Sequence, residues 1–423
     1  MLYRFARIFD FLVFTLAILL AAVGDTPRSM GESDQVRSFT REMEFDYPNW
    51  VWDAAWLKLE QGVIGSPYLF DRGTNKQIVF EYLRATQRLI LVRMRIQQIF
   101  ADPTIADKEG SSAFLRVQRD ELVTRQESLA PLAEAILQSQ VGEALAELRL
   151  TSGGQPLPPV LYHTSSTPLA LIVSPRSRIE QTTNISVLPT LSLDEQIKLE
   201  NEVARSLDVS TLIVATGGIG VYPTMVMETT DLRWMLSTIA HEWTHNYLNV
   251  RPLGINYSTT PELRTMNETT ANIAGDEMSQ LVLRKFYPEL LASFSSRDLI
   301  SLGEPSRPST GLDDPPPFDF RTEMHETRVE ADELLAQGKI EEAESYMERR
   351  RQFFWQNGYP LRKLNQAYFA FHGAYADVPG GAAGEDPVGP AVRALRAQSD
   401  SLKEFVNAIA WMTSFEQLQE AIR

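Results

Sequence analysis

The sequence contains no cysteine and only five histidines among its 423 residues. Without cysteine the chain can form no disulfide, iron–sulfur cluster, thiol nucleophile or cysteine-ligated zinc site. A metal site here must therefore be built from histidine, aspartate and glutamate. Because histidine is so scarce, the placement of two of them four residues apart, His241 and His245, is informative.

The chain also lacks an excess of basic residues, with 40 Lys and Arg against 55 Asp and Glu and a net charge of -15. A nucleic-acid-binding protein needs a basic face to displace phosphate counterions, so this class is excluded. An apolar content of 43% excludes a mostly disordered chain. A length of 423 residues exceeds what one hydrophobic core usually serves, which predicts two or three packed units.

The first 24 residues form a separate piece, in which Arg4 and Arg7 precede an uncharged apolar run over 11–23. A basic start followed by such a run is typical of an export signal or a single membrane anchor. An amphipathic or buried core helix is the alternative. We expect the protein to be exported or membrane-anchored, with its catalytic part outside the cytoplasm.

The rest of the chain divides by its hydrophobic periodicity. Helical spacing dominates 25–150, and a Gly/Pro-rich cluster at 151–159 marks a change in composition. Strand-like runs and helices fill 151–290, 291–320 is an irregular loop, and 321–423 is again helical, with a charged helical hairpin at 323–357. Trp50, Trp52 and Trp56 form a stripe that we expect to belong to the core.

A β-hairpin is predicted from strands at 210–215 and 219–227, joined by a turn at 216–218. Pro223 lies in the second strand, and because proline cannot donate to a ladder we expect that strand to be an edge strand. A helix over 231–248 follows directly, with Thr229 or Thr230 as its N-cap.

This helix carries the sequence HEWTH, an H-E-x-x-H motif formed by His241, Glu242 and His245. Residues i and i+4 share a helix face, so both imidazoles can reach one ion. Glu242 lies one position round the helix, where its carboxylate can accept a proton from the attacking water. The alternative is a pair of surface histidines that flank a glutamate by chance.

Catalytic zinc usually has three protein ligands, so the two histidines need a third. We assign Glu268, which opens a predicted helix over 267–286, 23 residues beyond His245. Glu262 is the rival ligand, in an expected loop, and a capping box with Thr265 would give Glu268 a purely structural role. Small residues after Glu268, among them Ala271 and Gly275, would let the two helices approach closely.

HEWTH together with NETTA, residues 267–271, resembles the gluzincin clan of zinc metallopeptidases. The resemblance implies a bound Zn2+ and a small twisted sheet whose edge strand packs on the motif helix and binds extended peptide. With helical N- and C-terminal regions, this amounts to an α+β, predominantly helical fold. Asn272 stands where the thermolysin-like pattern has aspartate, and it is a candidate to orient one of the histidines.

A donor for the tetrahedral oxyanion is expected on a predicted helix over 361–375 that closes the active site. Tyr368, His372 and Tyr375 form one polar stripe there, and His372 or Tyr375 is our candidate. The predicted function is hydrolysis of peptide or protein substrates by a zinc-activated water, with Glu242 as general base. A zinc hydrolase of a non-peptide substrate and a binding protein with a vestigial site are the alternatives.

Overall fold

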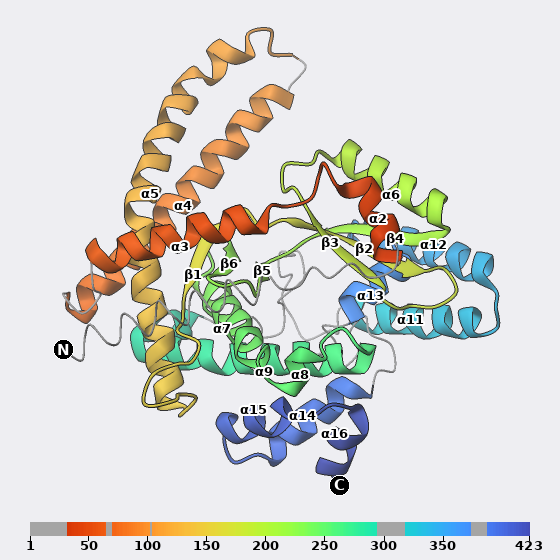
Figure 1. The fold of residues 1–423 in the computed structure, drawn as a ribbon. Helices are drawn as coiled ribbons and strands as arrows, with labels where there is room; N and C mark the ends of the chain where they lie inside the picture. The colour runs from red at the N-terminus through yellow and green to blue at the C-terminus, as the bar shows by residue number, and fades with distance from the viewer. Residues whose placement is uncertain (1–31, 65–69, 102–103, 294–317, 374–386) are drawn as a thin grey trace.

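The computed structural model describes residues 32–64, 70–101, 104–293, 318–373 and 387–423, and its fold is α+β and predominantly helical, as predicted. The N-terminal region is helical: α2 (Glu32–Thr40), α3 (Tyr47–Ile64), α4 (Arg72–Ala101) and α5 (Lys108–Glu147). Helices α4 and α5 form a long antiparallel hairpin that projects from the body of the molecule (Figure 1). Its base belongs to the main core, through buried residues of α5 such as Ile136, Leu137, Val141 and Leu145.

Within the described residues, the strands form two sheets of three strands each, where a single small sheet was predicted. The first sheet has the order β3-β2-β4, with β2 (Leu169–Pro175) antiparallel to both β3 (Thr183–Val187) and β4 (Val209–Ala215). Helix α6 (Leu193–Leu207) connects β3 to β4. The second sheet has the order β1-β6-β5, with β1 (Tyr162–Ser165) parallel to β6 (Thr224–Met227) and β5 (Gly218–Ile219) antiparallel to β6.

The prediction that 210–215 and 219–227 pair with each other as a hairpin is wrong. β4 belongs to the first sheet, and the hairpin is instead formed by β5 and β6 of the second sheet. Pro223 precedes β6, after a cis bond from Tyr222, so it ends the turn and does not interrupt a strand. Since β6 is the middle strand, the edge strand beside the motif helix is β5.

The centre of the molecule is built from α7 (Leu232–Leu248), α8 (Pro252–Ile255), α9 (Pro261–Phe286) and α10 (Pro288–Ser293). Helix α7 packs on α9, and both contribute to the largest hydrophobic core. This core also contains side chains from α14 (Val388–Gln398), α15 (Leu402–Ala410) and α16 (Phe415–Ala421), which pack on α9 (Figure 1). The two helices that carry the motif residues are thus held from several sides.

The expected charged hairpin is confirmed as α11 (Phe320–Ala336) and α12 (Ile340–Gln356), which turn at Gly338 with φ +75°. Helix α13 (Gln366–His372) follows and packs on β2 and β4. It is shorter than the predicted helix over 361–375, because Asn365 caps its N-terminus by accepting a hydrogen bond from Tyr368 N.

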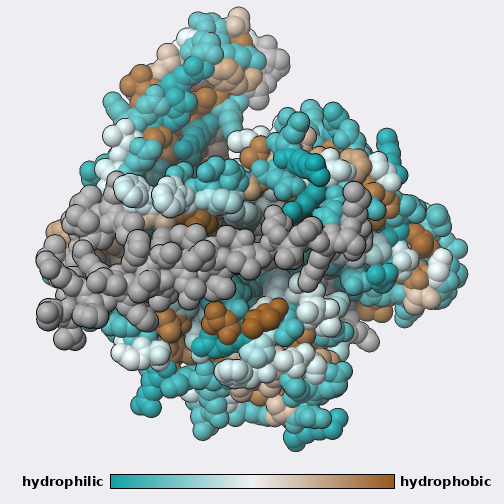
Figure 2. Space-filling model, viewed as in Figure 1, coloured by the Kyte–Doolittle hydropathy of each residue, from teal (hydrophilic) through white to brown (hydrophobic). Residues whose placement is uncertain are grey.

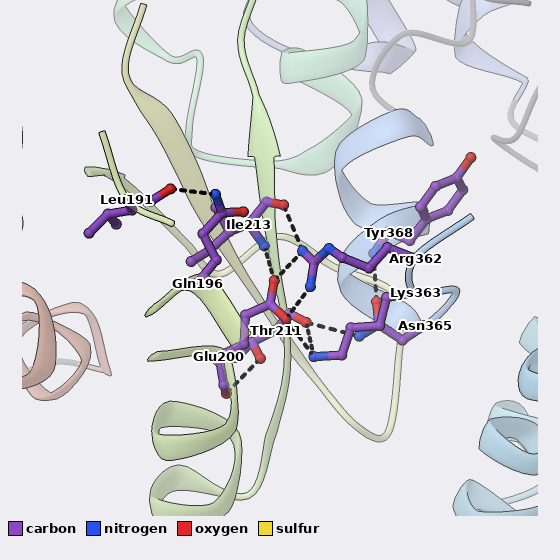
Figure 3. Close-up of polar contacts among 9 residues, drawn as sticks. All are labelled: Leu191, Gln196, Glu200, Thr211, Ile213, Arg362, Lys363, Asn365 and Tyr368. Carbon is purple, nitrogen blue, oxygen red and sulfur yellow. Dashed lines mark hydrogen bonds and ion pairs between the residues drawn. The ribbon is translucent and has the colours of Figure 1, made fainter. Parts of the chain in front are cut away.

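A buried glutamate fixes the segment that leads into α13 (Figure 3). Glu200 of α6, nearly inaccessible to solvent, accepts hydrogen bonds from the Arg362 guanidinium, from Lys363 and from the backbone N–H of Ile213 in β4. Asn365 adds a bond to the Thr211 carbonyl. These contacts hold the start of α13 against the first sheet.

The prediction that the tryptophan stripe is core is wrong for Trp52 and Trp56, which are 64% and 57% exposed on α3. The projecting hairpin also carries apolar side chains on its surface (Figure 2), among them Leu91, Met94, Phe114 and Val117. Among the described residues, no helix is long and apolar enough to span a membrane. The N-terminal segment 1–24, predicted as a signal peptide or anchor, lies outside those residues.

Candidate metal centre

Helix α7 begins one residue later than the predicted range, and its cap differs from the prediction. Asp231 is the N-cap, and its side chain accepts a hydrogen bond from Trp234 N at 3.0 Å. Thr229 instead accepts a bond from Asp231 N, so neither Thr229 nor Thr230 caps the helix. The apolar residues Leu232, Met235, Leu236 and Ile239 anchor α7 in the core. This packing fixes the position of the turn that carries His241, Glu242 and His245.

Helix α9 begins six residues before the predicted start, with Thr260 as N-cap and Pro261 in the first turn. Thr265 and Glu268 therefore both lie inside the helix, so the capping-box explanation of Glu268 is wrong. Glu268 is only 3% exposed. The rival Glu262 is exposed in the first turn of α9, not in a loop, and it is not part of the metal-ligating cluster that the described residues form.

The close approach of α7 and α9 depends on a glycine. A Cβ atom at Gly275 would lie 2.8 Å from the Ser237 carbonyl oxygen and 3.2 Å from His241 Cβ. A real Cβ atom essentially never lies as close as 2.8 Å to a backbone oxygen, so the present spacing of the two helices requires glycine here. Ala271 on the same helix is fully buried. The predicted role of small residues between the two helices is therefore seen most directly at Gly275.

The structure brings the three predicted ligands together. His241 Nε2 and His245 Nε2 are 3.0 Å apart, and Glu268 Oε2 lies 3.5 Å from each of them. Metal–ligand distances of about 2.0–2.2 Å around tetrahedral zinc imply ligand atoms roughly 3.3 Å apart. The three atoms therefore match three corners of a tetrahedral site, and the fourth corner is left for water or substrate.

The hydrogen bonds of Glu268 agree with this assignment. Its Oε1 accepts a bond of 2.5 Å from the Tyr257 hydroxyl, whereas its buried Oε2 accepts none from the described residues. A buried carboxylate oxygen without a donor is costly. A cation held by Glu268 Oε2 and the two imidazoles would satisfy it, so the donor set fits a metal ion. Tyr257 was not found by sequence reasoning, since it lies in the segment between α8 and α9, outside any motif.

The orientation of His245 is set by Asn267, the residue before the third ligand. Asn267 Oδ1 lies 2.8 Å from His245 Nδ1, and Asn267 Nδ2 donates to the Leu253 carbonyl at 3.4 Å. Because the amide oxygen faces the imidazole, Nδ1 carries the proton and Nε2 keeps its lone pair for the metal. Asn272, the candidate from sequence, makes no hydrogen bond to either histidine in the described part of the chain.

Glu242 lies against the backbone of the β5 hairpin. A Cβ atom at Gly218 would be 2.7 Å from Glu242 Oε1, and one at Gly220 would be 3.3 Å from Glu242 Oε2 and 3.3 Å from His245 Cβ. Because neither glycine has a side chain, the Glu242 carboxylate can occupy the space beside them. Glu242 is 7% exposed and borders the same cavity as the two histidines.

The charges of the centre act on one another at short range. Burial raises the pKa of Glu242, against the opposing effect of His241 and His245. Burial would also raise the pKa of Glu268, but the nearby histidines hold it well below its usual range. Burial lowers the pKa of His245, and the Glu268 carboxylate outweighs this and raises it to about 9. The carboxylate and the imidazoles thus stabilise each other's charges within a cluster that could hold a metal ion.

These residues open into a cavity of about 1030 Å³ between the two sheets, α7, α9 and α13. Helix α13 borders it through Phe369, Ala370 and Phe371, as the prediction of a closing helix requires. His372 is not among the lining residues: its ring packs on Tyr368 with centroids 4.3 Å apart, and burial lowers its pKa to about 4. Tyr375 lies outside the described residues, so the catalytic roles of His372 and Tyr375 stay predictions.

Comparison of the chain with protein-family models, with curated proteins and with solved structures gave no match. The resemblance to gluzincins therefore rests on HEWTH and NETTA alone.

Proposed function

We propose that this protein is a zinc-dependent peptidase of the gluzincin type, with His241, His245 and Glu268 as the metal ligands. The observation that carries the proposal is the triangle of His241 Nε2, His245 Nε2 and Glu268 Oε2, with sides of 3.0, 3.5 and 3.5 Å. The spacing suits one tetrahedral zinc ion, and Glu242 borders the same cavity.

In this proposal Glu242 is the general base. Zinc, when bound, supplies a Lewis acid that polarises the scissile carbonyl and lowers the pKa of the attacking water. Glu242 accepts the proton of that water and passes it to the leaving amine. Burial raises the pKa of Glu242, which brings a carboxylate closer to the range in which it can both accept and return a proton. The role of oxyanion donor stays a prediction from the sequence for His372, which does not line the cavity, and for Tyr375, which lies outside the described residues.

The edge strand β5 is proposed to bind the substrate. It is short, is paired on one side only, and lines the cavity through Gly218 and Ile219. An extended peptide can pair with such an edge through its main chain. Since Gly218 and Gly220 also contact Glu242, a peptide bound along β5 would lie beside the general base.

The test is hydrolysis of a peptide library by the purified protein before and after removal of zinc with a chelator. We expect cleavage by the zinc-loaded protein, loss of cleavage after chelation, and recovery when about one equivalent of zinc is returned. Cleavage of esters or amides but of no peptide would favour the non-peptide hydrolase. Bound zinc without any hydrolysis would favour a binding protein with a vestigial site.

A further inference from the structure

A cationic side chain, that of Arg264, lines the same cavity and has no assigned role. Arg264 lies on α9, four residues before Glu268, and lines the cavity. Residues four apart on a helix are neighbours on one face, with Cβ atoms about 6 Å apart. Tyr257 lies beside both residues: its hydroxyl donates to Glu268, and the Arg264 charge acts on its pKa. The guanidinium of Arg264 therefore lies next to the metal ligands.

The donors of Arg264 are only partly used. Its Nη2 donates a long bond of 3.4 Å to the Ala370 carbonyl, the Tyr257 hydroxyl accepts a further bond from its side chain, and its buried Nε donates to none of the described residues. Among those residues, no carboxylate lies within ion-pair distance of it. An arginine side chain carries five N–H donors and stays charged, so leaving its buried Nε without an acceptor is costly. An anion in the cavity would satisfy them.

The rest of the cavity is acidic. Six carboxylates line it, from Glu180, Glu242, Glu262, Glu268, Asp332 and Glu333, against two guanidinium groups. The other guanidinium, Arg328, is already paired with Asp332 at 2.6 Å. Arg264 is thus the cavity-lining guanidinium without a carboxylate partner in the described part of the chain. A substrate anion is attracted at this point and repelled by the carboxylates elsewhere.

We propose that Arg264 binds a carboxylate of the substrate and so selects peptides with a negative charge close to the scissile bond. Planar guanidinium and carboxylate groups match through two parallel hydrogen bonds. Because one extended residue spans about 3.5 Å, a carboxylate held here lies within one or two residues of a carbonyl held at the metal ligands. The carboxylate is either the C-terminal one or that of an Asp or Glu side chain. This inference rests on the proposed function for its substrate, but not for its binding test.

The binding test uses zinc-loaded Glu242→Gln protein, so that no probe is consumed. Two pairs of probes separate the two sources of carboxylate: acetyl-Ala-Ala against its C-terminal amide, and acetyl-Asp-Ala-amide against acetyl-Asn-Ala-amide. Calorimetry gives the dissociation constant of each. We expect the acid of at least one pair to bind ~10- to 100-fold more tightly than its neutral partner, as a charge-assisted pair of hydrogen bonds does.

The same titrations are repeated with three double variants, in which Arg264→Gln, Arg264→Lys or Arg328→Gln is combined with Glu242→Gln. Arg264→Gln should abolish the preference for the acid, and Arg264→Lys should restore part of it, while the zinc content and melting temperature stay those of the parent. Arg328→Gln is the matched control, since Arg328 lines the same cavity but is paired, and it should keep the preference. Equal binding of acid and neutral probes, or a preference that survives Arg264→Gln, would overturn the proposal.

The outcome is independent of peptide hydrolysis. Selective carboxylate binding that depends on Arg264, in a protein whose wild type cleaves no peptide, would contradict the proposed function and keep this site. Peptide cleavage without any charge preference would support the proposed function and contradict the carboxylate site at Arg264. If the wild type is active, Arg264→Gln should raise KM for the preferred acid at least ~10-fold and change kcat less. The reason is that the lost interaction is equally strong in the ground state and in the transition state.

Discussion

Asn267 Oδ1 lies 2.8 Å from His245 Nδ1, so the residue that orients one proposed metal ligand is the immediate neighbour of another, Glu268. Both belong to one helical turn of α9, a helix that approaches α7 closely where Gly275 leaves room for it. The position of α9 therefore sets two properties of the centre at once. It places the third ligand, and it selects the tautomer in which His245 Nε2 can bind metal.

This relationship makes Asn267 a testable positioning residue. Asn267→Ala removes the acceptor of the His245 Nδ1 proton and leaves all three ligands in place. Zinc affinity should fall by ~10- to 100-fold, the usual cost of losing such a partner of a ligating histidine. Competition with a chromophoric chelator measures the affinity. Asn272→Ala is the matched control, because Asn272 makes no hydrogen bond to the histidines, and an equal loss in both variants would contradict this role.

The glycine at 218 should be required for catalysis but not for metal binding. In Gly218→Ala the new Cβ would lie 2.7 Å from Glu242 Oε1 and from Thr238 Cγ2, so the base must move. We expect kcat to fall at least ~10²-fold, as for a displaced general base, while the zinc content is unchanged. Gly142→Ala is the control: its Cβ meets only Pro156, at an ordinary 3.8 Å, and it should keep full activity. Normal turnover by Gly218→Ala would refute the placement of Glu242.

A buried carboxylate outside the candidate metal centre, that of Glu134, should govern stability in acid. Burial would raise the pKa of Glu134, but Lys58 and His163 outweigh it and lower the pKa to about 2 from an ordinary 4.5. A lowered folded-state pKa adds stability above about pH 4.5, and this stability is lost as the pH falls towards 2. Denaturant unfolding between pH 2 and 7 should therefore show a steep loss of free energy of unfolding in this window.

In Glu134→Gln that part of the pH dependence should disappear. The protein should also be less stable at pH 7 by up to about 3–5 kcal/mol, because the buried ion pair between Lys58 and Glu134 is lost. Glu81→Gln removes an exposed carboxylate paired with Arg125 and should cost no more than about 1 kcal/mol. Similar costs for the two variants would show that the Glu134 network does not stabilise the fold as described.

Local patterns in the sequence predicted that His241 and His245 lie side by side, because their i, i+4 spacing places both on one face of a helix. Glu268 needed a helix–helix contact, and the small residue Gly275 gave a usable signal for it. Strand pairing was not predictable in the same way. β4 and β5 are separated by only two residues, yet they belong to different sheets, because their partners β2 and β6 are chosen by tertiary packing.

The sequence also does not predict which individual side chains connect one element to another. Tyr257 and Asn267 reach the centre through contacts that no periodic pattern encodes. Trp52 and Trp56 have helical spacing typical of a core, but the face of α3 that carries them is exposed. Periodicity reports which residues share a face, and it does not report whether another element covers that face.

The most direct test of the central claim is the zinc content of Glu268→Ala, measured beside that of Glu242→Gln after equal dialysis. Glu268→Ala removes one of three ligands, whereas Glu242→Gln removes the base and leaves every ligand in place. We expect about one zinc per chain in wild type and in Glu242→Gln, with hydrolysis lost in the latter, and strongly reduced zinc in Glu268→Ala. One tightly held zinc in Glu268→Ala would contradict the metal centre described above.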